Sequence, residues 1–184
     1  LGHFKVGAAD NGCFAHPERF DVEAYIAWLQ SMGAHAGRCL FATAPDVLAD
    51  APATLARSSP VLERIRAAGY RAALIAQDGL EDLDVPWGTF DVLFIGGTTG
   101  WKLGPRAASL ILEARRRGVP VHMGRVNSHR RLLGALNRGC QSADGTFLAF
   151  ASRGGAREHG IRRLLAWLDR LQAEPPLRLT EHGA

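Results

Sequence analysis

Short apolar runs recur along this chain and alternate with segments in which apolar residues follow helical spacing. The runs are rich in Val, Ile, Leu, Phe and Ala, and their polar neighbours mark where each one ends. A run of four to eight apolar residues bounded by turn residues indicates a buried strand. A weaker strand-like segment leads to Asp144. The other expected strands are, in chain order, Phe4–Ala9, Gly37–Thr43, Arg71–Ala76, Asp91–Ile95 and Val119–Met123.

Helices are expected between these strands, because apolar residues there recur at intervals of three and four. For the second helix, Ser59 is the expected N-cap, Pro60 the first helical residue and Gly69 the stop. The third opens at Pro105 and closes at Gly118. The inward faces of the first and last helices are expected to carry Val22, Tyr25, Ile26 and Leu29, and Ile161, Leu164, Leu165 and Leu168.

Six βα units in strict alternation predict a parallel sheet covered by helices. The chain lacks both GxGxxG after its first strand and GxxxxGK[ST], so the usual nucleotide-binding open sheets lose their motif. A polar or glycine-rich group instead follows every strand, as in the site of a (β/α)8 TIM barrel. We therefore expect a single barrel-like catalytic domain over residues 1–174 and a tail over 175–184. Six strands are visible, and the first two would lie upstream or be dispensed with.

Composition places the chain among ordinary globular proteins, with 47% apolar and 22% charged residues. The net charge is +4, and arginines gather in the C-terminal half, which suits a polyanionic partner such as nucleic acid or, equally, solvated helix faces. Cys13, Cys39 and Cys140 have no zinc-ligand spacing, so we expect no metal and a cytoplasmic location. No apolar run approaches membrane-spanning length.

The strand-end motifs, taken in order, resemble the tRNA-guanine transglycosylase family, whose barrel enzymes exchange a guanine for a 7-deazaguanine. The segment Asp10–Phe14 resembles the family's Asp-Ser-Gly-Gly-Phe, and Ala73–Gly79 resembles a strand ending in Val-Gln-Gly. Phe94–Gly97 is similar to its glycine pair, and His122–Gly124 to Leu-Met-Gly. Arg138-Gly139 leads to Asp144 as the family's Arg-Gly leads to its nucleophilic aspartate. The zinc cluster of the tRNA enzymes is missing, which fits a branch acting on DNA.

This resemblance implies a glycosyltransferase that works by double displacement, with Asp144 as nucleophile and Asp10 as acid/base. Lys102 stands where the family has a glutamate, and Asp46 is displaced from the family's base-reading position. The implied partners are DNA or tRNA and a 7-deazaguanine base, without a cofactor, in a possible homodimer or larger assembly. The expected base-binding residues are Gly12, Phe14, Asp46, Gln77, Gly96, Gly97 and Lys102, and the expected nucleic-acid contacts are Arg125, Arg153 and Arg157.

Two other functions remain open from the residues. One is a catalytically inactive paralogue that binds a base or nucleic acid, in which the aspartates are turn residues. The other is an unrelated barrel enzyme for a small molecule, whose Gly-Gly loops hold a phosphate.

Overall fold

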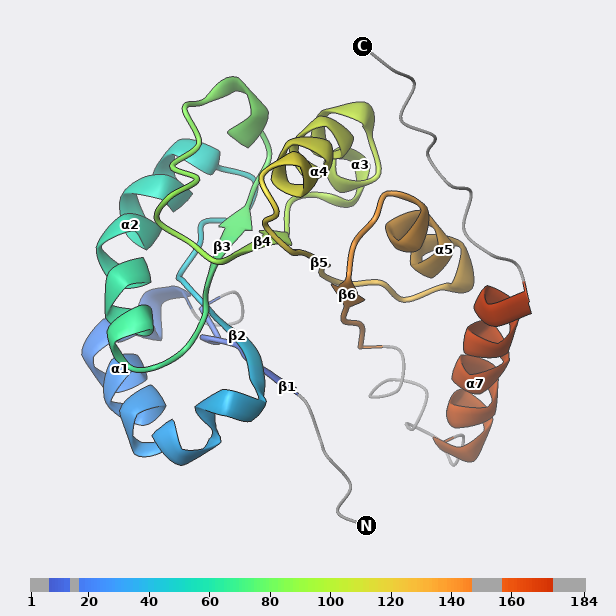
Figure 1. The fold of residues 1–184 in the computed structure, drawn as a ribbon, viewed down its shortest axis with the longest axis horizontal. Helices are drawn as coiled ribbons and strands as arrows, with labels where there is room; N and C mark the ends of the chain where they lie inside the picture. The colour runs from blue at the N-terminus through green and yellow to red at the C-terminus, as the bar shows by residue number, and fades with distance from the viewer. Residues whose placement is uncertain (1–6, 14–16, 147–156, 174–184) are drawn as a thin grey trace. The chain divides into compact units, whose positions relative to one another are not determined.

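The computed structural model describes residues 7–13, 17–146 and 157–173, and it separates into two compact units (Figure 1). The first unit is Leu1–Pro120 and the second is Val121–Ala184. The expected Phe14 and Arg153 contacts, the start of the first strand and the tail fall outside the described residues. Each unit is therefore treated by itself.

In its described residues the first unit has four parallel strands, whose order in the sheet follows the chain. Strands β3 and β4 pair in continuous register from Ala73 with Val92 to Ala76 with Ile95. Sequential order is typical of barrels, whereas a doubly wound sheet reverses direction at a switch point. The parallel α/β prediction is confirmed, and β2, β3 and β4 are slightly shorter than expected. The strands are β1 (Gly7–Ala9), β2 (Cys39–Thr43), β3 (Ala72–Ala76) and β4 (Val92–Ile95).

Helices of the first unit connect these strands, and Figure 1 shows α1 and α2 side by side. The side chain of Asp21 caps α1 by accepting from the backbone of Glu23 and Ala24. The short helix α3 follows β4, where a loop was expected, because Thr98 accepts from Trp101 N and caps it. The helices are η1 (Pro17–Arg19), α1 (Val22–Ser31), η2 (Gly33–Arg38), α2 (Ala51–Ala67), η3 (Leu80–Asp82), α3 (Thr99–Lys102) and α4 (Pro105–Arg116).

The expected start of the second helix at Ser59 is wrong. Helix α2 begins at Ala51, nine residues before Pro60, because the Asp50 side chain caps it by accepting from Ala53 N at 2.9 Å. Pro60 lies inside this helix, and the Ser59 hydroxyl donates to the carbonyl of Leu55. The stop was predicted correctly, since Gly69 follows the helix with a φ of 89° that favours glycine.

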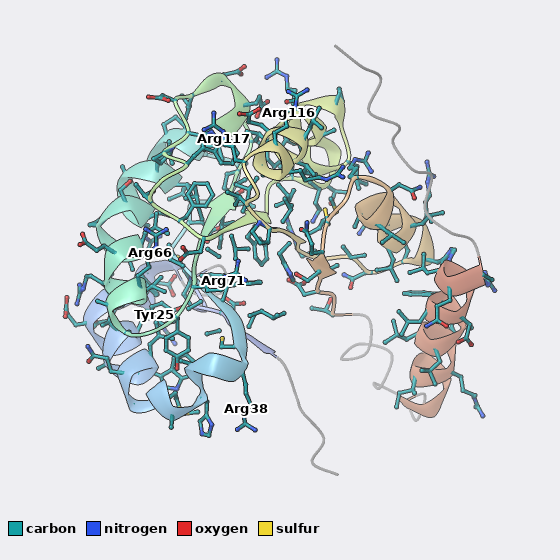
Figure 2. The ribbon with its side chains drawn as sticks, in the orientation of Figure 1. Tyr25, Arg38, Arg66, Arg71, Arg116 and Arg117 are labelled. Atoms are coloured by element: carbon teal, nitrogen blue, oxygen red, sulfur yellow. The ribbon has the colours of Figure 1, made fainter. Side chains whose placement is uncertain are left out.

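The core of the first unit is built around β3, in which all five residues are buried. Such a strand has no solvent face, which explains its uninterrupted apolar sequence. Phe41 and Phe94 meet edge to face beside it, with ring centroids 6.0 Å apart. At the amino end of the strand Arg66 forms two hydrogen bonds to Asp91, and Figure 2 labels Arg66 and Arg71 in this region.

The described residues of the second unit, 121–146 and 157–173, form two short parallel strands and two helices. His122 of β5 is in register with Ser142 of β6. The side chain of Ser128 caps α5, and Gly139 ends the connection after it at a φ of 85°, as predicted. The elements are β5 (Val121–Met123), α5 (His129–Asn137), β6 (Ser142–Ala143) and α7 (Arg157–Ala173).

The prediction that Ile161, Leu164, Leu165 and Leu168 form the inward face of the last helix is wrong. Trp167 is the buried aromatic of α7, at 8% exposure. Leu164 is half-buried, and the other three residues of the expected inward face are exposed: Ile161, Leu165 and Leu168. Helical spacing gives the apolar face of a helix but not the surface it packs on, and here the larger indole is covered instead.

Within the described ranges, no helix combines the length and the apolar character needed to cross a membrane. The same ranges hold no group of three His, Cys, Asp or Glu side chains arranged to bind a metal ion.

Candidate functional site

Polar residues meet at the carboxyl ends of β1 to β4, where the sequence predicted a site. We call Asp10, Asp46, Gln77 and Gly96 the strand-end cluster. They follow β1, β2, β3 and β4 respectively, and parallel strands bring their carboxyl ends to one edge of the sheet. The structure thus places four of the predicted residues on one side of the first unit.

Asp46 and Gln77 form the buried centre of this cluster. The Gln77 Nε2 donates to Asp46 Oδ2 at 2.5 Å, and the two residues are 2% and 8% exposed, Gln77 being the more buried. Gln77 Oε1 accepts from Ala49 N at 3.0 Å, so one amide orients both the carboxyl group and the loop after β2. Burial raises the pKa of Asp46 above its ordinary value, and the Gln77 hydrogen bond opposes this only in part.

Asp10 lies near enough to Asp46 for its charge to raise the Asp46 pKa further. Unlike Asp46, Asp10 is exposed, and its Oδ1 accepts from Gly12 N at 3.1 Å. The adjacent Asn11 fixes the turn by donating through its side chain to the Ala44 carbonyl at 2.9 Å and to Thr43 Oγ1 at 3.0 Å. One carboxyl is therefore buried and the other open to solvent.

Arg57 and Cys13 border Asp46 from two other elements. Arg57 donates to the Asp46 carbonyl at 3.2 Å while its guanidinium lies 5.4 Å from the centroid of the Phe20 ring. Cys13 donates to the same carbonyl at 3.5 Å, and burial raises the pKa of its thiol. Because both contacts reach the backbone carbonyl, the Asp46 side chain keeps Gln77 as its side-chain partner among the contacts described.

Gly96 approaches the cluster so closely that a side chain would collide with it. A Cβ atom there would lie 2.6 Å from Ile75 Cγ2 and 3.0 Å from Gln77 Nε2. At Gly97 the Trp101 ring occupies the corresponding space, 2.2 Å from where a Cβ would be, and Trp101 Nε1 donates to Glu81. Gly96 therefore contacts the cluster, and Gly97 is covered by an indole.

Lys102, expected to face an incoming base, is 1% exposed. It ends helix α3, and its long side chain is enclosed within the first unit. Gly12, which follows Asp10, adopts a φ of 71° and has open space around it. These positions of Lys102 and Gly12 leave the predicted base-binding role of either residue untested.

A hollow of about 360 Å³ opens beside Asp10. The rings of Phe20, Tyr25 and Trp28 line it together with Asn11 and Gly12. Tyr25 donates to the Thr43 carbonyl at 3.0 Å, and its pKa is raised by burial, so the phenol is held neutral. The hollow has the size of a small-molecule site and adjoins the exposed carboxylate.

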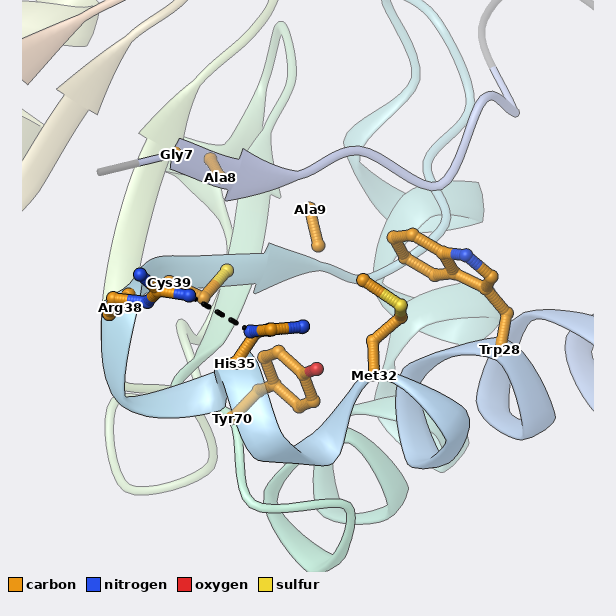
Figure 3. A pocket seen from close by; sticks show the side chains of 9 residues that line it. All are labelled: Gly7, Ala8, Ala9, Trp28, Met32, His35, Arg38, Cys39 and Tyr70. Carbon is orange, nitrogen blue, oxygen red and sulfur yellow. Dashed lines mark hydrogen bonds between the residues drawn. The ribbon is translucent and has the colours of Figure 1, made fainter. Parts of the chain in front are cut away.

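A second hollow of about 400 Å³ lies along β1 and at the start of β2, and it shares Trp28 with the first (Figure 3). Met32, His35 and Tyr70 line it, and Arg38 contacts His35 at 3.1 Å. Amino ends of barrel strands serve stability rather than catalysis. Although larger, this hollow is lined by none of the strand-end cluster, so we place the candidate site beside Asp10.

Asp144 lies in the second unit, at the end of β6. Its carboxylate accepts from His122 Nε2 at 3.1 Å and from Arg125 N at 2.9 Å, with the side chain 51% exposed. Arg125 adopts a φ of 59°, unusual for a residue other than glycine. Arg157 is the first residue of α7, and its side chain falls outside the described structure. The predicted nucleic-acid contacts thus remain predictions.

Sequence reasoning missed Asn11, Arg57 and the His122–Ser142 contact. Asn11 stands between two residues that were chosen, so its turn position was a usable signal. Arg57 was not considered because the predicted start of α2 at Pro60 placed it in a loop, whereas it lies inside the helix. His122 lies inside an apolar strand in the sequence, and the pairing of β5 with β6 is what reveals its polar partners.

The fold is similar to that of a solved structure described as "Native KDPGal structure", an aldolase with a TIM-barrel-like fold. The match covers 90% of this chain and 68% of that chain, with 15% identity and a TM-score of 0.57. It defines the class as an α/β protein with a fold like part of a TIM barrel. No family model and no curated protein matches the sequence.

The expected membership of the tRNA-guanine transglycosylase family is wrong, and so is the expected guanine-exchange activity. The solved structure reported above is an aldolase, and none of the comparisons supports a transglycosylase. The physical reason is that glycines and carboxylates at strand ends are shared by parallel α/β folds of many functions.

Proposed function

We propose that this protein is an enzyme that transfers a proton on a small carbonyl compound at the strand-end cluster. The observation that carries the proposal is the buried carboxyl of Asp46, held by Gln77 at a strand end with its pKa raised. Carboxyl groups in such positions, with a pKa shifted by burial and by a neighbouring charge, are typical of acid–base catalysis.

Asp46 is the proposed hydrogen-bond donor to the carbonyl oxygen. A protonated carboxyl group donates a hydrogen bond to an oxygen on which negative charge develops, and burial shifts the pKa of Asp46 in the direction that favours this form. Gln77 fixes its orientation through the 2.5 Å contact and is itself fixed by Ala49 N. The energetic gain comes from this fixed geometry, because little reorganisation is needed when the charge appears.

Asp10 is the proposed base that takes the proton from the carbon next to the carbonyl. Its exposure keeps the carboxylate hydrated and accessible, and the adjoining 360 Å³ hollow accommodates a compound of a few carbon atoms. A buried carboxyl as acid and an exposed carboxyl as base divide the two roles of enolisation. Such a proton transfer is part of aldol-type cleavage.

The carbonyl substrate class rests on analogy with the aldolase whose fold is similar. We also propose that the complete fold is an eight-stranded (β/α)8 barrel. At 15% identity the likeness concerns the fold. The assignment of roles instead comes from Asp46, Gln77 and Asp10, which are present whatever the neighbour does.

Hydrogen–deuterium exchange on pyruvate and on a panel of short 2-keto acids and aldehydes tests this function. Proton NMR in D₂O should show loss of the signal next to the carbonyl with the wild-type protein. Asp46→Asn should slow exchange about 10²-fold or more, since an acid is replaced by an amide of similar shape. Asp84→Asn is the matched control, because this aspartate is exposed and outside the cluster. No exchange with any compound, or equal rates in Asp46→Asn, would contradict the proposal.

A further inference from the structure

A serine, a histidine and an aspartate form a continuous hydrogen-bonded chain in the second unit. Parallel pairing sets His122 of β5 opposite Ser142 of β6. The His122 Nδ1 lies 2.8 Å from Ser142 Oγ, and its Nε2 lies 3.1 Å from Asp144 Oδ2. The imidazole is 4% exposed and thus protected from water on nearly all sides.

The partners fix which ring nitrogen carries the hydrogen. An ionised carboxylate only accepts, so Nε2 must donate to Asp144. Nδ1 then has a lone pair and accepts from the Ser142 hydroxyl. This arrangement has the chemistry of a Ser-His-Asp triad, in which the carboxylate selects the tautomer and the histidine removes the serine proton.

The loop after β5 holds Asp144 in place from the other side. Arg125 N donates to Asp144 Oδ1, and Val126 N donates to the Asp144 carbonyl at 2.6 Å. Gly145 packs so closely that a Cβ there would lie 2.5 Å from the Val126 carbonyl oxygen. The φ of 59° at Arg125 is an unfavourable backbone state that this loop maintains, as is common at functional sites.

We propose that Ser142 is a nucleophile activated by His122, with Asp144 as the positioning residue, and that it acts on activated acyl esters. Ser142 Oγ attacks the carbonyl carbon while its proton moves to His122 Nδ1. The C–O bond to the leaving alcohol then breaks, and that alcohol receives the proton. Water, deprotonated by the same nitrogen, hydrolyses the acyl-serine and restores the hydroxyl. This activity is separate from carbonyl proton transfer and uses none of the residues proposed for it.

A fluorophosphonate probe tests the nucleophile directly on the full chain. Attack by Ser142 forms an O–P bond and releases fluoride, and peptide mapping by mass spectrometry locates the adduct. We expect labelling at Ser142 that is absent in Ser142→Ala and unchanged in Ser109→Ala, an exposed serine whose hydroxyl donates to Arg106 O. An adduct on another serine, or none on the wild type, would overturn the proposal.

The roles of His122 and Asp144 are tested by the rate of labelling. His122→Gln should lower that rate about 10²-fold or more, because the base is lost. Asp144→Asn should lower it as well and should alter its pH profile, since the amide no longer selects the tautomer. Circular dichroism checks folding, and the half-exposed Asp144 site tolerates an amide of the same size. Equal labelling rates in a folded Asp144→Asn variant would contradict the proposed role of Asp144 in positioning His122.

Discussion

Two carboxylates of the first unit, Asp46 and Asp91, differ in what compensates their burial. Asp46 has one amide donor, so burial prevails and its pKa rises. Burial also acts to raise the pKa of Asp91, but Arg66 and the backbone of Ala72 outweigh it, and the net pKa is lowered. One carboxyl is thus suited to holding a proton and the other to stabilising the fold.

Asp91→Asn should destabilise the protein at neutral pH by about 1–2 kcal/mol, because a two-pronged contact with Arg66 is lost from a partly exposed site. A carboxyl whose folded pKa is lowered contributes stability above its unfolded pKa, near 3.9. That stability is lost as the pH falls through the folded pKa. Urea unfolding from pH 7 to pH 2 should therefore show the two proteins converging in acid. A constant difference would show that the charge is not involved.

The sequence located Asp10, Asp46 and Gln77 because polar residues directly after apolar strands are visible in the one-dimensional pattern. It did not reveal the Asp46–Gln77 pair. That contact depends on the path of the loop after β2. In this loop Ala49 has a φ of 59°, and its backbone N donates to Gln77. Local spacing carries no information about such a backbone path.

At the scale of elements, the error in α2 shows how two valid N-terminal signals compete. Ser59-Pro60 and Asp50 followed by Pro52 both match the start of a helix, and the earlier one is used. The interior proline costs the helix one backbone hydrogen bond. Thr54, Ser58 and Val61 on the buried face show that the whole length packs against the unit.

The position of the cap can be tested with two alanine variants. Asp50→Ala should lower the free energy of unfolding by about 1 kcal/mol, because Ala53 N loses its side-chain acceptor. Ser59→Ala, by contrast, should change it by less than about 0.5 kcal/mol, since an exposed hydroxyl bonded within the helix is removed. Thermal and urea unfolding measure both values. A larger loss in Ser59→Ala would restore the cap at that residue.

Gly96 connects the end of β4 to the cluster. Gly96→Ala should destabilise the first unit by about 1–3 kcal/mol, because the new methyl group meets Ile75 and Gln77. Gly100→Ala, at a site with open space and an ordinary φ, is the control and should be neutral or slightly stabilising. Urea unfolding measures the difference. Equal effects would mean that Gly96 is not closely packed.

At the scale of the whole molecule, alternation of strands and helices was enough to predict a parallel α/β fold, and the strand order and the similar solved structure agree with it. The same reasoning did not identify the family. Five short strand-end motifs were matched in order, but each is also what a parallel fold needs at that place: a glycine for a turn, a carboxylate for a cap. Their order reflects the fold more than the chemistry.

The central claim is that Asp46 holds a proton where ordinary aspartates have lost it, and carboxyl-carbon NMR tests this most directly. The protein labelled at aspartate carboxyls is titrated from pH 3 to pH 8, and comparison with Asp46→Asn assigns the signal. We predict that Asp46 titrates above the exposed aspartates, and higher still in Gln77→Ala, where the opposing hydrogen bond is gone. Stability should accordingly fall as the pH rises from the unfolded pKa toward the folded one. If Asp46 titrates with or below the other aspartates, it is an ionised structural residue and the proposed proton donor does not exist.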